Sequence, residues 1–384
     1  MKRVILKLIF LFLVACLLGM GSGAIGLSIH QALSVSIFFS SILGTLFFWD
    51  FRLSFAFLGT SILLITKTID LEHIIEFSSL EVILFLVGMM VIIGLLKEEG
   101  FFAWIVSLIL RIRNLTSRKF VFCIAIISAL LACAVDEVTS IIFIVAAVFE
   151  ICDYFEVDPV PYIIISVLAT NIGSAGTVLG NPIGILIATK SGLTFEDFML
   201  KAFPLAMTCL LVTILIVLFW YRKALRKLDA KIKELGGNEV FIRLISIPPD
   251  RQTKIALLIF GTTLFFLAIS HRLDVLLSLG ANTVLLVIPL ITAACIMVWR
   301  HNKASDFIEK DVEWWTLLFF LMLFIQAGTL KYSGATEVLA GKIIGFARSN
   351  THILTGTLWF SAIGSSILDN VVLVAAFVPI VQGF

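Results

Sequence analysis

Long apolar segments separated by short polar connections occupy almost the whole chain, and they do not alternate residue by residue as β-strands do. Because a bilayer core of ~30 Å needs about 20 apolar residues per helix, the pattern predicts an all-α polytopic membrane protein with about eight to ten spans. After a first span near the N-terminus, the predicted helices are 31–49, 53–67, 81–112, 160–190, 195–221, 254–270, 275–299 and 314–347.

Two further apolar stretches carry polar residues at their centres. A charge at bilayer depth costs roughly 2.5–3.5 kcal/mol, so such residues indicate a functional site. A re-entrant hairpin places them at its tip, where irregular backbone is tolerated if it lines a cavity. We therefore expect two re-entrant hairpins, with two ordinary spans in each stretch as the alternative. The stretches and their polar pairs are 119–151 with Asp136-Glu137, and 351–383 with Asp369-Asn370.

The segments that precede the two hairpins resemble each other. Ile83–Gly100 aligns without gaps with Leu317–Gly334, and the identical pairs include Gly94/Gly328, Lys97/Lys331 and Gly100/Gly334. An odd number of spans per repeat gives the repeats opposite topology, which is typical of secondary transporters. We expect a first helix and loop (1–30), a first inverted repeat (31–221), a basic cytoplasmic loop (222–253) and a second inverted repeat (254–384).

The two repeats differ in length after their hairpins. In the first, a broken helix and a further span follow Asp136 and continue to Tyr221, whereas the sequence ends at Phe384, shortly after Asp369. We therefore expect the second repeat to be truncated by about two helices of roughly 20 residues each, with their connections.

Charge and composition place the chain in a membrane and orient it. Hydrophobic residues make up 60% and charged residues 14%, whereas soluble domains carry about 25% charged residues. The loop from Arg222 to Lys254 holds nine basic and four acidic residues, which predicts a cytoplasmic location. Counting spans back from it places the N-terminus in the cytoplasm of a multi-pass cell-membrane protein. The six cysteines lack metal-binding spacing.

A cluster of small and polar residues interrupts the predicted helix 160–190. Glycine and proline weaken the helical hydrogen-bond ladder, which frees carbonyls for a cation and amides for an anion near the bilayer centre. A packing face of small residues is the alternative. The candidate residues here are Thr170, Asn171, Gly173, Ser174, Gly176, Thr177 and Asn181, within TNIGSAGTVLGNP (170–182).

The acidic pair at the first hairpin favours a cation or proton site. Carboxylates buried in a low dielectric have raised pKa values and can exchange a proton near neutral pH, and Thr139 adds a hydroxyl oxygen. An internally paired charge that fixes the hairpin tip is the structural alternative. The candidate residues at the two tips are Asp136, Glu137, Thr139, Asp369 and Asn370, and Na⁺ ligation is expected from Asp136, Thr139, Asn171 and Asp369.

Four runs in this chain resemble the ion transporter superfamily, in its branch of arsenite permeases, NhaD-type sodium/proton antiporters and citrate-type permeases. They are FLVGMMVIIGLLKEEGFFAW, AVDEVTS, ATNIGSAGTVLGNPIGILI and ILDNVVLVAA. The resemblance implies two re-entrant hairpins, two discontinuous helices, often a homodimer, and ion-coupled transport. This chain has Asp-Glu at the first tip and GNPIG at the break, where many members have Asp-Asn and GDPPN. These departures leave the coupling ion open.

Together these features predict an ion-coupled secondary transporter for a small ion, working by alternating access. Buried acids favour Na⁺ or H⁺ as coupling ion, and the amide-rich break favours an anion as cargo. An electroneutral Na⁺/H⁺ antiporter is the main alternative, and a channel is another. No HExxH, GxGD or GxSx(A/G) signature of an intramembrane enzyme occurs. The expected partners are the lipid bilayer and a small ion, with no nucleic acid and no cofactor.

Overall fold

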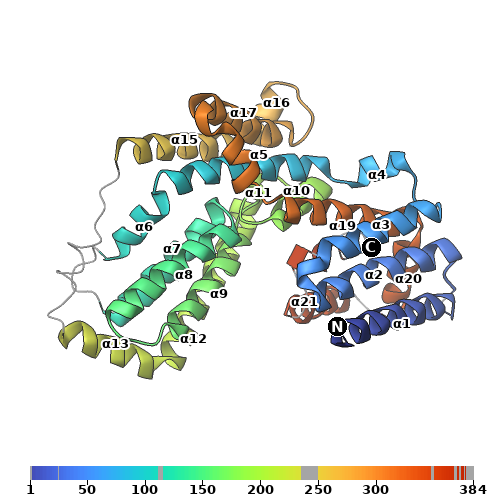
Figure 1. Ribbon diagram of the computed structural model, residues 1–384, viewed down its shortest axis with the longest axis horizontal. Coiled ribbons are helices and arrows are strands. Elements are labelled where there is room, and N and C mark those ends of the chain that lie inside the picture. Colours follow the sequence, from blue (N-terminus) through green and yellow to red (C-terminus); the bar gives the residue numbers. More distant parts are fainter. Residues whose placement is uncertain are drawn as a thin grey trace. The chain divides into compact units, whose positions relative to one another are not determined.

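The structure, a computed structural model, describes residues 2–24, 26–110, 116–234, 250–346 and 350–366, together with residues 370, 371, 373–375 and 377 (Figure 1). Every regular element within these ranges is a helix. Seven of these helices are long and apolar enough to cross a bilayer. The prediction of an all-α polytopic membrane protein is therefore confirmed.

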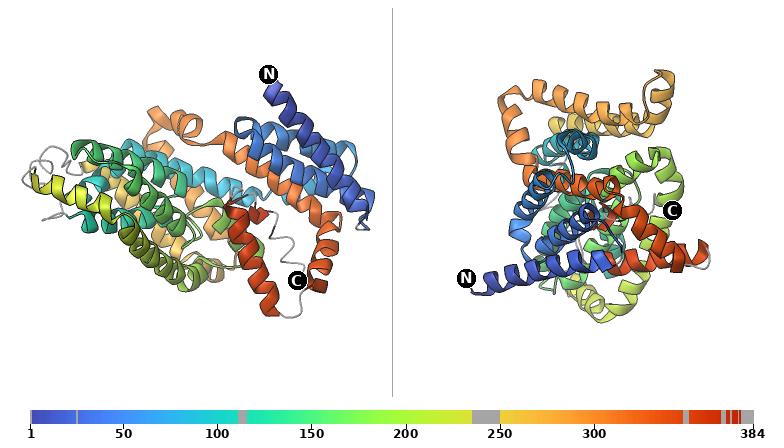
Figure 2. Two further views of the ribbon diagram at one scale, coloured as in Figure 1. Left: turned by 90° about the horizontal axis from the view of Figure 1, so that it is seen from below. Right: turned by 90° about the vertical axis from the view of Figure 1, so that its right-hand side faces the viewer.

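The chain divides into two compact units, and the first comprises Met1–Ile83 and Glu313–Phe384. Within it, α19 packs on α2, α3 and α4 (Figure 2). Its elements are α1 (Lys2–Ala24), α2 (Ile29–Phe47), η1 (Trp49–Phe51), α3 (Arg52–Ile65), α4 (Leu71–Phe77), α19 (Trp314–Tyr332), α20 (Ala335–Phe346) and α21 (Asn350–Ser365).

The second unit is Leu84–Val312, and it contains the first hairpin and the glycine-rich break. Helix α7 packs against α8 and α9, and α12 covers α9. Its longer helices are α5 (Leu80–Glu98, whose first turn belongs to the other unit), α6 (Phe101–Leu110), α7 (Ser117–Ala134), α8 (Glu137–Tyr154), α9 (Val160–Ser174), α10 (Pro182–Ser191), α12 (Phe203–Trp220), α13 (Arg222–Glu234), α15 (Arg251–Ala268) and α17 (Thr283–Trp299). Its short elements are α11 (Phe195–Asp197), η2 (Phe198–Ala202), α16 (Ser270–Leu276), η3 (His301–Lys303), α18 (Ala304–Asp306) and η4 (Phe307–Asp311).

Glycines divide two predicted long helices at matching positions. The segment 81–112 forms α5 and α6, and the segment 314–347 forms α19 and α20. Gly100 ends the first helix of one pair with φ of +70°, and Gly334 ends that of the other with φ of +77°. Only glycine adopts this left-handed backbone readily, so the hydropathy pattern alone did not reveal the turns. When Gly100 is aligned with Gly334, α5 and α19 begin and end at equivalent positions.

The packing of α5 mirrors the packing of α19. A Cβ at Gly94 of α5 would overlap the side chain of Asp311 in η4, within the second unit. A Cβ at Gly328 of α19 would overlap the ring of Phe77 in α4, within the first unit. The same alignment that pairs the two glycines also pairs Phe77 with Asp311. In each unit, the long helix of one sequence half thus packs on the short helix of the other half.

The apolar stretch 119–151 folds as two helices joined by Val135 and Asp136. Helices α7 and α8 each have 18 residues, about 27 Å at 1.5 Å per residue. They lie side by side in Figure 1, and α9 accompanies them. The re-entrant course of this pair stays a prediction. In the second stretch, 351–383, the described residues form α21 and a few further helical positions from residue 370.

The basic segment 222–253, predicted as a loop, begins with a helix of 13 residues, α13. Its apolar residues recur at helical spacing, and Leu225, Leu228 and Ile232 are buried. Because charged residues dominate this segment, its composition did not indicate the short amphipathic helix.

Candidate functional site

Asp136 is the residue at which the chain restarts as a helix after the first hairpin turn. Its backbone is extended, and its carboxylate oxygen Oδ1 accepts a hydrogen bond of 2.8 Å from the backbone N–H of Thr139. This is an N-cap, which satisfies one of the amides left free at a helix start. Asp136, Glu137 and Thr139 are all half-buried.

Asn181 plays the same part at the glycine-rich break. Helix α9 ends at Ser174, and α10 begins at Pro182. The side-chain oxygen of Asn181 accepts a hydrogen bond of 2.8 Å from the backbone N–H of Gly184. Proline at the first helical position suits this arrangement because its missing N–H would otherwise need a partner. The predicted interruption of the helix 160–190 is therefore present.

Three hydrogen bonds that backbone carbonyls accept join the hairpin turn to the break. The backbone N–H of Glu137 donates to the carbonyl of Gly180 at 3.1 Å, and the hydroxyl of Thr177 donates to the carbonyl of Cys133. The thiol of Cys133 in turn donates to the carbonyl of Gly173 at 2.9 Å. Cys133 was not among the predicted site residues, because a cysteine gives no polar signal in an apolar segment. Gly180 lies within the predicted break but was not among its candidate residues.

Asn181, Ser174 and Glu137 form a chain of polar side chains across this junction. The amide nitrogen Nδ2 of Asn181 donates to the hydroxyl of Ser174 at 3.1 Å. That hydroxyl lies 3.0 Å from the carboxylate oxygen Oε2 of Glu137 and 3.0 Å from the carbonyl of Asn171. A single hydroxyl proton serves one of these two acceptors at a time. The side chains of two helix starts are thus linked through one buried hydroxyl.

Two glycines allow the helices to approach this closely. A Cβ at Gly173 would collide with the backbone of Ala129 in α7. A Cβ at Gly180 would collide with the backbone of Ser174 and would lie 2.8 Å from the carbonyl oxygen of Ala132. The close approach of two backbones therefore explains why both positions are glycine. Both positions lie at the polar junction.

The remaining predicted residues of the break point away from this chain of hydrogen bonds or act through their backbone. The hydroxyl of buried Thr170 donates to the carbonyl of Ser166, and the amide of Asn171 donates to the carbonyl of Val167 at 3.1 Å, both within α9. Gly176 donates its N–H to the carbonyl of Gly173. Buried Ser140, which the sequence did not single out, lies in the first turn of α8, and its Oγ makes no hydrogen bond among the described residues.

At the second predicted tip, Asn370 is helical and half-buried, whereas Asp369 lies outside the described residues.

The two helix starts differ in charge. The N-terminus of α8 carries Asp136 and Glu137, whose negative charges offset the positive end of the helix dipole. The N-terminus of α10 carries the neutral Asn181 and no acidic residue in its first turn. Carboxylate and hydroxyl oxygens suit a hard cation such as Na⁺, whereas a helix start without an acid suits an anion. The junction thus brings together two helix starts of different charge.

Comparison with known proteins agrees with this chemistry. The family model described as citrate transporter matches residues 45–384. The chain belongs to the citrate transporter family. This is a family of secondary transporters of anions, and the chain is a transporter and not an enzyme.

Similar proteins occur in bacteria and mammals. An uncharacterized transporter of Mycobacterium tuberculosis is 29% identical over 303 residues, covering 78% of this chain and 68% of the relative. A 46 kDa membrane protein of Mycobacterium leprae is 26% identical over 313 residues, covering 79% and 68% of the two chains. The P protein of Homo sapiens is 26% identical over 377 residues, covering 81% of this chain and 45% of its own length.

Proposed function

We propose that this protein is an ion-coupled secondary transporter that moves a small anion, driven by Na⁺ or H⁺, by alternating access. The observation that carries the proposal is the side-chain link from Asn181 through Ser174 to Glu137. It joins the acidic start of α8 to the uncharged start of α10. Cation and anion environments therefore share one hydrogen-bonded junction in the second unit.

The cation is proposed to bind at the hairpin turn. Asp136 and Glu137 supply negative charge, and Thr139 and Asn171 supply neutral oxygens. Asp369 and Asn370 are proposed as the equivalent ion-binding residues of the second repeat. No cofactor is needed for this exchange of ions.

The anion is proposed to bind at the start of α10, close to the bound cation. Unoccupied, the acidic pair repels an anion, and a bound cation or proton offsets part of that charge. Cation binding therefore favours anion binding, and the effect is reciprocal because the two affinities are linked. Gly173, Gly176, Thr170 and Thr177 are proposed to shape the junction rather than to carry charge.

A citrate-like organic anion is the first candidate for the cargo, because the family model that matches the chain is described as citrate transporter. One observation favours a different candidate, the electroneutral Na⁺/H⁺ antiporter. Two carboxylates, Asp136 and Glu137, lie at one hairpin turn, and such a pair can exchange one proton for one Na⁺ without any anion.

One vesicle preparation tests these candidates. The purified chain in proteoliposomes is assayed for uptake of citrate, arsenite, sulfate and ²²Na⁺ under imposed Na⁺ and H⁺ gradients. Saturable citrate uptake that requires one of the gradients supports the anion transporter. Exchange of ²²Na⁺ for protons without anion uptake would instead favour the antiporter. Anion flux that neither saturates nor responds to a gradient would indicate a channel.

The domain boundaries are proposed as an inverted repeat, 31–221 and 254–384, around the basic segment 222–253. The equivalent bounds of α5 and α19 and the mirrored packing of Gly94 and Gly328 support a repeat. Arg118 is the second residue of α7, Thr351 is the second residue of α21, and both are exposed. If the repeats have opposite topology, these two residues lie on opposite sides of the membrane. Single cysteines at these positions are expected to react with an impermeant reagent from opposite sides of the membrane. Labelling from the same side would contradict the inversion.

The proposed location is the cell membrane, with the N-terminus and the segment 222–253 in the cytoplasm. A homodimer is proposed as the assembly, and cross-linking of the reconstituted protein tests it directly.

A further inference from the structure

Helix α13 begins immediately after a membrane span. It follows α12 with only Tyr221 between them. The last two residues of α12, Phe219 and Trp220, are exposed, and the guanidinium of Arg222 lies 5.5 Å from the centre of the Phe219 ring. Exposed aromatic residues at the end of a span are typical of the membrane-water interface. The first turn of α13 therefore lies at the level of the lipid headgroups.

The two faces of α13 have opposite character. Leu225, Leu228 and Ile232 are buried against the protein. Six basic and two acidic residues give the helix a net charge of +4. Lys231 differs from the other basic residues because it pairs with Glu156 at 3.0 Å and with Glu234 at 3.6 Å. The remaining basic residues are all exposed, and we call them the basic face: Arg222, Lys223, Arg226, Lys227 and Lys233.

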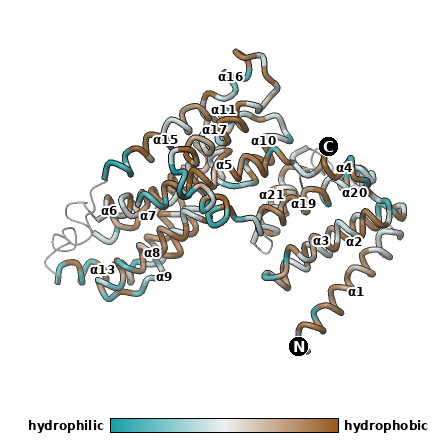
Figure 3. Tube along the Cα trace, turned by 45° about the horizontal axis from the view of Figure 1, so that its top comes forward, coloured by the Kyte–Doolittle hydropathy of each residue, from teal (hydrophilic) through white to brown (hydrophobic). Residues whose placement is uncertain are grey.

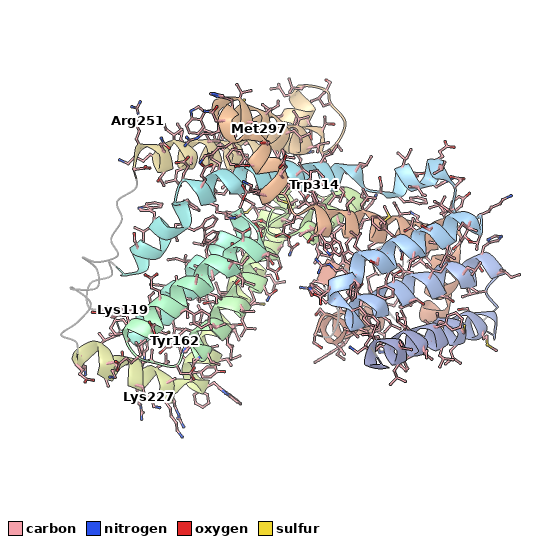
Figure 4. The ribbon with its side chains drawn as sticks, viewed as in Figure 1. Lys119, Tyr162, Lys227, Arg251, Met297 and Trp314 are labelled. Carbon is pink, nitrogen blue, oxygen red and sulfur yellow. The ribbon has the colours of Figure 1, made fainter. Side chains whose placement is uncertain are left out.

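A carboxylate holds α13 in place with this face outward. Asp229 accepts hydrogen bonds from the backbone N–H of Ser117 at 2.7 Å and from its hydroxyl at 2.9 Å. It thereby also satisfies an amide at the start of the hairpin helix α7. Figure 4 shows Lys227 projecting from α13 away from α7, and Figure 3 shows hydrophilic positions recurring along α13. These hydrogen bonds keep a row of exposed cations next to the end of α12.

We propose that the basic face of α13 binds the headgroups of anionic phospholipids. The charge on the face is complementary to phosphate groups, and its span of about 16 Å reaches several headgroups. Clusters of about four to eight basic residues next to a span bind anionic lipid surfaces. The location beside exposed Phe219 and Trp220 favours a lipid over a soluble partner.

The selectivity of the reconstituted protein for spin-labelled phosphatidylglycerol over spin-labelled phosphatidylcholine tests the proposal. Electron paramagnetic resonance measures the ratio of the two association constants in symmetric vesicles, so the result does not depend on the orientation of the chain. The wild-type protein is expected to prefer the anionic lipid several-fold, and the preference should weaken as salt is added. The combined variant Lys223→Gln/Arg226→Gln/Lys227→Gln/Lys233→Gln is expected to bring the ratio close to one.

Two controls separate charge on this helix from other effects. Exchanging lysine and arginine at the same four positions retains the charge and should retain the preference. Arg251→Gln/Lys254→Gln removes two exposed charges at the start of α15, outside the basic face, and should lower the ratio much less than the four-fold variant does. If the four-fold variant fails to fold, Lys223→Gln/Lys227→Gln is measured instead, and a partial loss of preference is expected.

Equal binding of the two lipids by the wild-type protein, or an unchanged ratio in the neutralised variants, would overturn the proposal. Inorganic phosphate is added at constant ionic strength as a further arm. Loss of the lipid preference at millimolar phosphate would assign the basic face to a soluble anion and would also overturn it.

Discussion

The hydroxyl of Ser174, the last residue of α9, lies 3.0 Å from the carboxylate of Glu137, the first residue of α8. Each of these residues stands where a helix is interrupted, and the two interruptions are far apart in the sequence. The same hydroxyl also accepts a hydrogen bond from Asn181. A change in the charge of Glu137 can therefore alter the hydrogen bonding at the start of α10. This relationship is the basis of the coupling that we propose.

Ser174→Ala removes this link without adding volume. A hydrogen bond to a charged group is worth about 1.5–3 kcal/mol, so we expect the concentration of coupling ion for half-maximal transport to rise roughly ten-fold. Transport kinetics in proteoliposomes measure the change. Ser166→Ala is the matched control, because Ser166 is buried in the same helix and donates only to the carbonyl of Tyr162. An unchanged half-saturation in Ser174→Ala would contradict a role of the hydroxyl in coupling.

The glycines of the junction are predicted to be intolerant of a methyl group. Gly173→Ala and Gly180→Ala place a Cβ against the backbones of Ala129 and Ser174, and overpacking of this kind costs about 1–3 kcal/mol. Both variants should melt at lower temperature in detergent and transport more slowly. A Cβ at Gly261 of α15 meets open space, so Gly261→Ala serves as control and should melt like the wild-type protein. Wild-type stability of Gly173→Ala and Gly180→Ala would refute the close approach.

Asp136→Asn separates the charge of the hairpin turn from its structure. An asparagine still offers an oxygen to the backbone N–H of Thr139, so the cap of α8 should persist. We expect normal membrane insertion and thermal stability, together with loss of ion coupling. Wild-type transport and wild-type pH dependence in this variant would leave Asp136 a purely structural residue.

Much of this architecture was predictable from hydropathy and charge. The predicted interruptions at Asp136 and at 170–182 coincide with real helix ends, since a charge, several glycines and a proline each oppose a continuous helix. Gln326 is a lone amide in an apolar span, and its Nε2 donates to the carbonyl of Ala56 in another helix at 2.9 Å. Such contacts can be predicted because a polar group in an apolar span needs a hydrogen-bond partner.

Other features were not predictable, because their sequence signal is weak or shared by many residues. The left-handed turns at Gly100 and Gly334 depend on single glycines among 25 in the chain. Cys133 lies at the junction through its thiol, although a cysteine in an apolar segment is usually a small packing residue. Thr170 resembled a ligand in the sequence, yet its hydroxyl donates within its own helix, as threonine in a membrane helix often does.

Burial at the end of α5 predicts a specific pH dependence of stability. The side chain of Glu99 is 6% exposed, and this burial raises its pKa above the ordinary 4.5, with Glu98 and Asp250 acting in the same direction and the guanidinium of Arg300 opposing them. A raised pKa means that the folded protein favours the neutral carboxyl. Its contribution to stability is therefore complete below pH 4.5 and is lost as pH rises through the raised value.

The variant Glu99→Gln stays neutral and should lack this loss of stability. Melting temperatures of both proteins, measured from about pH 4 to about pH 8, check the prediction. The difference between wild type and variant should grow in favour of the variant with rising pH. Glu309→Gln, at an exposed glutamate, should follow the wild-type curve. A melting curve of Glu99→Gln that stays parallel to the wild-type curve at every pH would show that burial of this carboxyl has no energetic consequence.

Gradient-driven uptake of citrate by Glu137→Gln and Glu150→Gln tests coupling at the hairpin most directly. Both substitutions remove a carboxylate from α8, but Glu150 is exposed and lies near the opposite end of that helix, whereas Glu137 is its first residue and contacts Ser174. We predict that wild type and Glu150→Gln accumulate citrate only under an inward Na⁺ or H⁺ gradient, and that Glu137→Gln loses this dependence. Full gradient dependence in Glu137→Gln, or no gradient dependence in the wild-type protein, would contradict the account.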